Sequence, residues 1–152
     1  MKLRKIIGRL QELHPKEIDL SLDRIRDLCK RLGNPQDKIK AISIVGTNGK
    51  YSTIQAMFAI LKEANIKCNL YTSPHIKNIN ERFVFDNQEL NDEKLANLFE
   101  EVENANNNEP ITFFEILTAA YFLKASKYPD NINLIETGLF HRFDATNILK
   151  NN

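Results

Sequence analysis

Two series of apolar residues at helical spacing occupy the start of the chain. From Leu3 to Leu13, and again from Leu22 to Leu32, an apolar residue recurs every three or four positions. This spacing predicts two amphipathic helices, because it gathers the apolar side chains on one helix face. Gly33-Asn34-Pro35 follows the second series and is expected to end its helix.

The pattern changes after residue 40. Residues 41–45 form a compact apolar run typical of a buried strand, residues 53–64 have the periodicity of a helix, and residues 67–71 predict a second short strand. A helical connection of this length between two strands favours parallel pairing with a right-handed crossover.

The following segment predicts a hairpin and a helix. Residues 82–90 alternate around a turn at Asp86-Asn87, which is typical of a small hairpin. Asn91 is then expected to cap a helix that continues through Val102, and the polar residues 104–108 are expected to form a loop.

The last elements complete an alternation of helices and strands. Thr112 and Glu115 fit a capping box, which predicts a helix to about Lys127, and residues 132–135 predict a third strand that ends at Glu136. We therefore expect a three-layer, P-loop-type α/β domain with a mainly parallel sheet and additional N-terminal helices.

Small, polar and glycine residues follow the first predicted strand, in the run Gly46-Thr47-Asn48-Gly49-Lys50-Tyr51-Ser52. Free backbone N–H groups at the start of a helix bind anions, glycine permits close approach, and lysine adds a positive charge. The general pattern G-x-x-x-x-G-K-[ST] is matched incompletely, since Ile44 and Tyr51 stand where it has glycine and a hydroxyl residue. The run thus predicts a phosphate-binding loop, with a plain glycine-rich turn as the alternative.

Each predicted strand ends in a polar loop: residues 46–52, residues 72–75 and residues 136–147. Parallel strands place their carboxyl ends, and therefore these loops, at one edge of the sheet, where ligands of such domains bind. We expect a lysine, several hydroxyl groups, a histidine and an acid to meet there.

Composition and charge restrict the class of partner. The chain has 152 residues, of which 42% are hydrophobic, and a net charge of +1. This length suits one domain and leaves no room for a second complete one. The balanced charge gives no general attraction to nucleic acid or to a membrane surface, and no apolar run is long enough to span a bilayer. A cytoplasmic protein is expected.

Five collinear motifs resemble the folylpolyglutamate synthase and dihydrofolate synthase family, a branch of the Mur ligase superfamily. The resemblance extends from about Leu10 to Asn147. Its motifs are Ile18-Asp19-Leu20-Ser21-Leu22-Asp23-Arg24, Gly46-Thr47-Asn48-Gly49-Lys50, Tyr71-Thr72-Ser73-Pro74-His75 with Asn80-Glu81-Arg82, Thr112-Phe113-Phe114-Glu115, and Glu136-Thr137-Gly138-Leu139 with Arg142 and Asp144-Ala145-Thr146-Asn147.

This resemblance implies an ATP-dependent ligase that joins L-glutamate to the carboxylate of dihydropteroate or of a reduced folate. The carboxylate would attack the γ-phosphate of ATP, and the amine of glutamate would displace phosphate from the resulting acyl phosphate. ATP and Mg²⁺ are the implied cofactors, because a cation offsets the repulsion between an anionic nucleophile and a triphosphate. The full-length protein is expected to be a monomer.

The resemblance also assigns roles to residues. Lys50 would be catalytic and would bind ATP together with Thr47, Asn48, Gly49, Tyr51 and Ser52. Ser73 and Glu136 would bind the metal. The pterin would contact Thr112, Phe113, Phe114, Glu115, Phe143, Asp144 and Ala145.

Each role has a structural alternative. Lys50 could instead be a solvated lysine at a helix start, Ser73 an ordinary turn serine, and Glu136 a strand-end acid in a salt bridge. Phe113 and Phe114 could be core residues, and Glu115 could serve only the capping box.

Three features depart from the family. Tyr51 and Phe140-His141 replace glycines, and the family continues for more than twice this length. We therefore expect residues 1–152 to be the N-terminal part of a Mur-ligase-like ATP-binding domain that lacks the C-terminal glutamate-ligase domain and does not complete the active site alone. The alternative is a stand-alone or degenerate module that binds Mg-ATP or phosphate without ligation.

Overall fold

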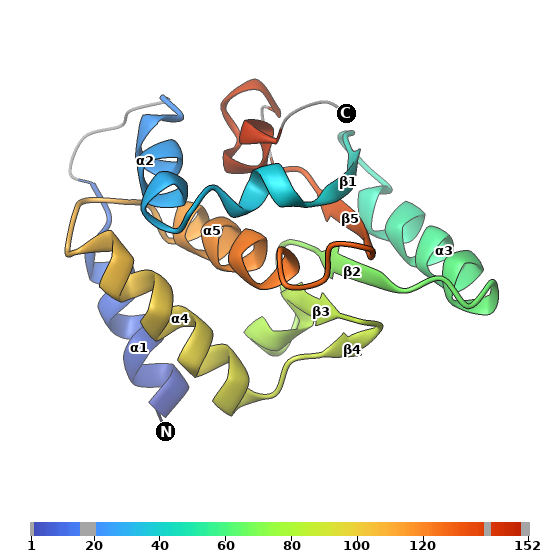
Figure 1. The fold of residues 1–152 in the computed structure, drawn as a ribbon, viewed down its shortest axis with the longest axis horizontal. Helices are drawn as coiled ribbons and strands as arrows, with labels where there is room; N and C mark the ends of the chain where they lie inside the picture. The colour runs from blue at the N-terminus through green and yellow to red at the C-terminus, as the bar shows by residue number, and fades with distance from the viewer. Residues whose placement is uncertain (1, 16–20, 139–140, 150–152) are drawn as a thin grey trace.

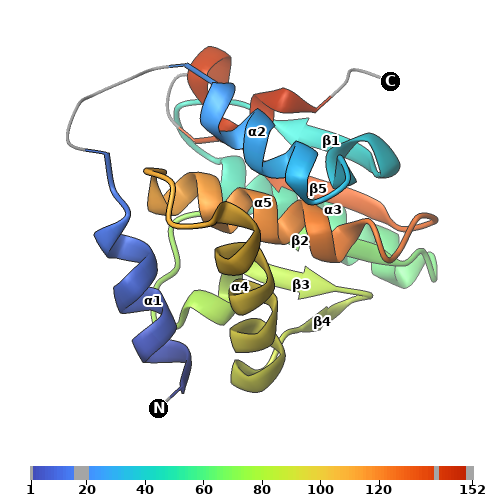
Figure 2. The same cartoon turned by 60° about the vertical axis from the view of Figure 1, so that its left-hand side comes forward.

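A computed structural model describes residues 2–15, 21–138 and 141–149, and within them five strands form one sheet with helices on both faces (Figures 1 and 2). The elements are α1 (Lys2–Glu12), α2 (Asp23–Arg31), β1 (Lys40–Ile44), α3 (Lys50–Glu63), β2 (Cys68–Tyr71), β3 (Phe83–Phe85), β4 (Gln88–Glu89), α4 (Asp92–Asn106), α5 (Phe113–Ala125) and β5 (Ile132–Glu136), with short 3₁₀ helices η1 (Pro35–Lys38), η2 (Ile79–Arg82), η3 (His141–Phe143) and η4 (Ala145–Ile148).

The strand order is β1-β5-β2-β3-β4, and the first three strands are parallel. Ile44 at the end of β1 pairs with Glu136 at the end of β5, and Tyr71 at the end of β2 pairs with Ile135. The prediction of three parallel strands is confirmed. Their carboxyl ends lie at one edge of the sheet, and β3 and β4 extend it as an antiparallel hairpin.

Alternating side chains of the central strands divide the interior into two cores. Leu70 and Leu134 pack with Ile54 of α3 on one face of the sheet. Their neighbours Tyr71 and Ile135 belong to the larger core on the opposite face, together with residues of α1, α2, α4 and α5. The sheet therefore separates α3 from the other long helices, as expected for three layers. No helix in the described part of the chain is long and apolar enough to cross a membrane.

The prediction that residues 41–45 form a buried strand is wrong. Among the described residues β1 pairs with β5 alone and lies at the edge of the sheet; Ile42 within it is 43% exposed, and Val45 directly after it is 57% exposed. A short apolar run gives no information on whether a strand is central or at the edge, because both carry the same residue types. Two helix boundaries also differ: α3 begins at Lys50, before residue 53, and α4 continues into the predicted polar loop as far as Asn106.

The local start and turn signals are confirmed. Asp86 and Asn87 both adopt positive φ, at 53° and 65°, in the turn between β3 and β4. The Asn91 side chain caps α4, and Thr112 and Glu115 form the predicted capping box at the start of α5. These side chains satisfy backbone N–H groups that a helix leaves without partners.

Buried asparagines connect β2 and β5 at the end of the sheet opposite the carboxyl ends of the parallel strands. Asn133 accepts hydrogen bonds from Asn69 Nδ2 at 3.0 Å and from the Tyr121 hydroxyl at 2.8 Å. Its own amide donates to the Lys40 carbonyl at 2.9 Å, on β1. One side chain thus connects all three parallel strands and α5 by hydrogen bonds in the interior.

We expect Asn133→Ala to lower the free energy of unfolding by about 1–3 kcal/mol, because it leaves several buried polar groups without partners. Urea denaturation followed by circular dichroism measures the change. Asn97→Ala is the matched control, since Asn97 is exposed and its recorded bond is to Lys2, and it should change stability by less than about 0.5 kcal/mol. Equal effects of the two substitutions would contradict a structural role for the buried network.

Candidate functional site

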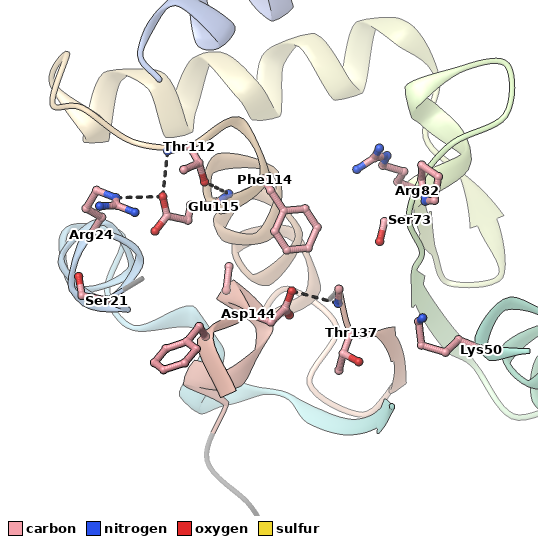
Figure 3. A pocket seen from close by; sticks show the side chains of 14 residues that line it. Ser21, Arg24, Lys50, Ser73, Arg82, Thr112, Phe114, Glu115, Thr137 and Asp144 are labelled. Carbon is pink, nitrogen blue, oxygen red and sulfur yellow. Dashed lines mark hydrogen bonds and ion pairs between the residues drawn. The ribbon is translucent and has the colours of Figure 1, made fainter. Parts of the chain in front are cut away.

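A cavity of about 570 Å³ opens at the edge of the sheet where the parallel strands end (Figure 3). Segments far apart in the sequence contribute to it, and each of the three predicted strand-end loops supplies at least one residue. Its lining consists of Ser21, Arg24, Lys50, Ser73, Pro74, Arg82, Thr112, Phe114, Glu115, Thr137, Gly138, Phe143, Asp144 and Ala145.

The predicted phosphate loop borders this cavity through Lys50. Gly49 precedes α3 with φ 78°, a conformation that favours glycine, and Lys50 is the first helical residue. The Lys50 ammonium donates a hydrogen bond to the Gly46 carbonyl at 2.8 Å, so it lies folded across the loop. The other predicted ATP-binding residues are exposed and do not line the cavity; they are Thr47, Asn48, Gly49, Tyr51 and Ser52.

The two predicted metal ligands are neighbours. The Ser73 backbone N–H donates to Glu136 Oε2 at 2.9 Å, which joins the loop after β2 to the end of β5. Ser73 lines the cavity, and Glu136 is buried beside it. Among the described residues no group of three His, Cys, Asp or Glu side chains could hold a metal. A hydroxyl and a carboxylate nevertheless suit Mg²⁺, which takes few protein ligands and fills its coordination with water and phosphate oxygens.

Two aromatic side chains contribute to the lining of the cavity. Phe114 is half-buried and stacks on Tyr71 with ring centroids 6.1 Å apart, while Phe143 is 47% exposed. Both rings line the cavity and could stack on a flat ligand. Phe113 does not line it; this side chain packs, partly buried, against the larger core, as the structural alternative predicts.

Glu115 lies at one end of the cavity and already has several partners. Its Oε2 accepts from the Thr112 backbone N–H at 2.8 Å and from Arg24 Nε at 3.1 Å (Figure 3). The capping-box role is therefore present, and the ion pair with Arg24 adds a second constraint. Together they fix Thr112 and Glu115 at the wall of the cavity.

Asp144 is buried and organises the loop after β5. Its Oδ1 accepts from the Gly138 backbone N–H at 3.0 Å, and its Oδ2 accepts from both the backbone N–H and the hydroxyl of Thr146. A Cβ added at Gly138 would clash with Asp144 Oδ1, so any other residue here would displace the Asp144 carboxylate. Ala145 follows, buried, at the same wall.

Several lining residues received no role from the sequence, among them Ser21, Arg24, Arg82 and Thr137. Each of these residues lies within a motif that carries the family resemblance, so the motifs could have identified them as candidate site residues. The residues of the opening motif before Ser21, and the Phe140 departure, lie outside the described residues.

Arg82 and His75 form an unusual pair at the opposite end from Glu115. Arg82 Nε donates to His75 Nδ1 at 2.9 Å. Burial and the nearby guanidinium lower the pKa of His75 below its ordinary value of 6.5, although the Glu81 carboxylate raises it. Burial also lowers the pKa of Arg82, while Tyr71 and Glu136 raise it.

Gly138→Ala should lower the free energy of unfolding by about 1–3 kcal/mol, because the new methyl group displaces the Asp144 carboxylate. Gly8→Ala is the matched control: Gly8 lies within α1, a Cβ there meets nothing within 4 Å, and alanine should stabilise the helix by about 0.5–1 kcal/mol. Thermal and urea denaturation of both variants test the opposite signs. Stabilisation by both substitutions would rule out the close approach at Gly138.

The His75 ring should titrate below pH 6.5 in an NMR titration, and its midpoint should rise in Arg82→Gln, which removes the adjacent positive charge. In the wild type, the lowered pKa means that the unfolded chain binds the His75 proton more readily than the folded chain does. Protonation of His75 therefore lowers the free energy of unfolding as the pH falls below 6.5. A midpoint at or above the ordinary value would contradict the Arg82–His75 contact.

Comparisons with known proteins point to one family, although no family model matches. The chain is 35% identical over 145 residues to the dihydrofolate synthase/folylpolyglutamate synthase of Escherichia coli, covering 94% of this chain and 34% of that protein. It is 36% identical over 137 residues to the protein of the same name from Bacillus subtilis, covering 85% of this chain and 32% of that protein. The chain thus spans about a third of the length of these relatives.

Solved structures agree. A bifunctional folylpolyglutamate synthase/dihydrofolate synthase from Yersinia pestis, complexed with AMPPNP and Mn ion, matches with a TM-score of 0.89 at 30% identity, over 97% of this chain and 36% of that one. E. coli FolC in complex with DHPP and ADP matches with a TM-score of 0.88 at 33% identity, over the same shares. The chain is therefore similar, over nearly its whole length, to the N-terminal third of the dihydrofolate synthase/folylpolyglutamate synthases.

Proposed function

We propose that this chain supplies the phosphate, metal and pterin contacts of an ATP-dependent ligase that joins L-glutamate to dihydropteroate or to a reduced folate. The observation that carries the proposal is the single cavity in which Lys50, Ser73, Phe114 and Asp144 meet from four separate segments. Its chemistry suits a ligand that has a flat ring at one end and an anion at the other.

The end of the cavity that binds the anionic part of the ligand would be formed by Lys50, Ser73 and Glu136. Lys50 would release the Gly46 carbonyl and turn to the phosphates of ATP, since a phosphate is a stronger acceptor than a peptide carbonyl. Ser73 and Glu136 would hold Mg²⁺, which would offset the charge of the triphosphate. A solved bifunctional folylpolyglutamate synthase/dihydrofolate synthase that is 30% identical to this chain has Mn, AMPPNP and L-glutamate bound, which supports this reading.

The end of the cavity that holds the flat ring of the ligand would be formed by Phe114 and Phe143. The surrounding wall would consist of Thr112, Glu115, Asp144 and Ala145. Two rings can stack on a pterin, and the fixed acids give polar contacts at its edge. DHPP bound to E. coli FolC supports a pterin-linked ligand.

Complete ligation is proposed for a longer assembly. Residues 1–152 would be the N-terminal part of the ATP-binding domain, and glutamate capture would use segments that the relatives have beyond the matched third. The sequence-based expectations of a cytoplasmic location and of a monomeric full-length protein stay predictions.

A second candidate is a module that binds Mg-ATP or phosphate without ligation. Tyr51, 52% exposed, occupies the first turn of α3 next to Lys50, where a phenol near the phosphates would alter their placement. This candidate shares the phosphate site with the first and differs in lacking turnover.

Lys50→Ala should weaken binding of AMPPNP with Mn²⁺ by about tenfold or more, because it removes a charge-assisted hydrogen bond to phosphate. Isothermal titration calorimetry on the 152-residue chain measures this effect. Lys62→Ala, at the exposed last turn of the same helix, is the matched control and should bind as the wild type does. Equal affinity of Lys50→Ala and wild type would reject the phosphate site.

A chimera separates the two candidates. The first third of the E. coli relative is replaced by this chain, and phosphate release is measured with ATP, dihydropteroate and glutamate. Release that depends on Lys50 supports the ligase. Nucleotide binding without release supports the binding module.

A further inference from the structure

Arg82 presents a positive charge to the cavity, and the Glu136 carboxylate stabilises this charge from beyond ion-pairing distance. It is half-buried at the end of η2, and its guanidinium points into the cavity that Ser73 and Lys50 also line (Figure 3). Its recorded hydrogen bond is made through Nε, and among the described residues no carboxylate lies within ion-pairing distance of it. Arg24, at the opposite end, instead pairs with the Glu115 carboxylate at 3.1 Å.

The partner of Arg82 is a neutral acceptor. Because Arg82 Nε donates to His75 Nδ1, this ring nitrogen carries no proton, and the imidazole orients the guanidinium without cancelling its charge. The two terminal amino groups of Arg82 therefore keep their donors for a ligand. An arginine held in this way presents a planar pair of N–H groups, which matches the two oxygens of a carboxylate.

The loop that carries His75 is itself held in place. Glu81 accepts backbone hydrogen bonds from Ile76 at 2.8 Å, Lys77 at 2.9 Å and Asn78 at 2.8 Å. Both oxygens of the Glu81 carboxylate, the one nearest to Arg82 in the sequence, therefore accept hydrogen bonds from the backbone. The fold thus uses Glu81 for the loop and leaves the arginine to a neutral histidine.

We infer that Arg82, positioned by His75, binds the carboxylate of the pterin-linked substrate at the metal end of the cavity. The inference rests on the proposed function and adds to it the residue that recognises the reacting group. Phe114 and Phe143 would hold the ring, and the acid at the far end of the ligand would then lie beside Arg82, Ser73 and Lys50, where phosphate is to be transferred. His75 is a positioning residue, since it acts through Arg82.

Calorimetry with dihydropteroate and with its uncharged carboxamide tests this inference on the 152-residue chain. The wild type should bind the carboxylate about tenfold or more tightly than the amide, the effect expected for a charge-assisted pair. Arg82→Gln should bring the two affinities to about the same value and leave the affinity for the amide unchanged. Arg4→Gln, on the exposed face of α1, is the matched control and should keep the wild-type ratio.

Rescue tests the role of His75. His75→Ala should reduce the preference for the carboxylate, and His75→Gln, whose side-chain oxygen can accept from Arg82 Nε, should restore it. A purely structural role would not depend on the acceptor. An unchanged ratio in His75→Ala would overturn the positioning role.

The remaining outcomes are distinct. If Arg82→Gln keeps the preference for the carboxylate, the assignment of Arg82 is overturned while the proposed function stands. If Arg82→Gln lowers the affinity for AMPPNP with Mn²⁺ and keeps the preference for the carboxylate over the amide, Arg82 binds phosphate, and the carboxylate assignment is again overturned. If the wild type binds neither pterin compound, the proposed function and this inference both fail.

Discussion

Parallel pairing of β1, β5 and β2 is the constraint on which the rest of the molecule depends. It aligns Ile44 with Glu136 and Tyr71 with Ile135, so that three chain segments leave the sheet at the same edge. No local interaction within one segment could bring these loops together. The sheet register therefore decides that a lysine at the start of α3 lies near a serine after β2 and an acid at the end of β5.

Short-range hydrogen bonds to carboxylates then fix the loops themselves. Glu136 holds the Ser73 backbone, Glu81 holds the backbone of residues 76–78, and Asp144 holds Gly138. Each carboxylate accepts hydrogen bonds from backbone N–H groups that lack a helix or strand partner in these irregular loops. The cavity is consequently lined by side chains whose backbones are already in place, which lowers the entropic cost of binding a ligand.

Signals that act over a few residues were predictable from the sequence, such as the capping box of Thr112 and the turn at Asp86-Asn87. The alternation of strands with helices, a pattern of the whole chain, predicted three parallel strands with a common edge. The exposure of β1 was not predictable, because it depends on which strands pair beside it. Phe113 and Phe114 are adjacent in sequence and both pack against the larger core, yet of the two only Phe114 lines the cavity, which the sequence could not distinguish. The Arg82–His75 contact requires the three-dimensional course of the loop after β2.

We propose above all that the edge formed by the carboxyl ends of the parallel strands is a metal-assisted triphosphate site. A crystal structure of this chain grown with AMPPNP and Mn²⁺ tests it most directly, since manganese is identified by its anomalous scattering. The account predicts manganese bound by the Ser73 hydroxyl and the Glu136 carboxylate, with the Lys50 ammonium on the phosphates. Nucleotide and metal bound at another surface, with Lys50 still on the Gly46 carbonyl, would contradict it.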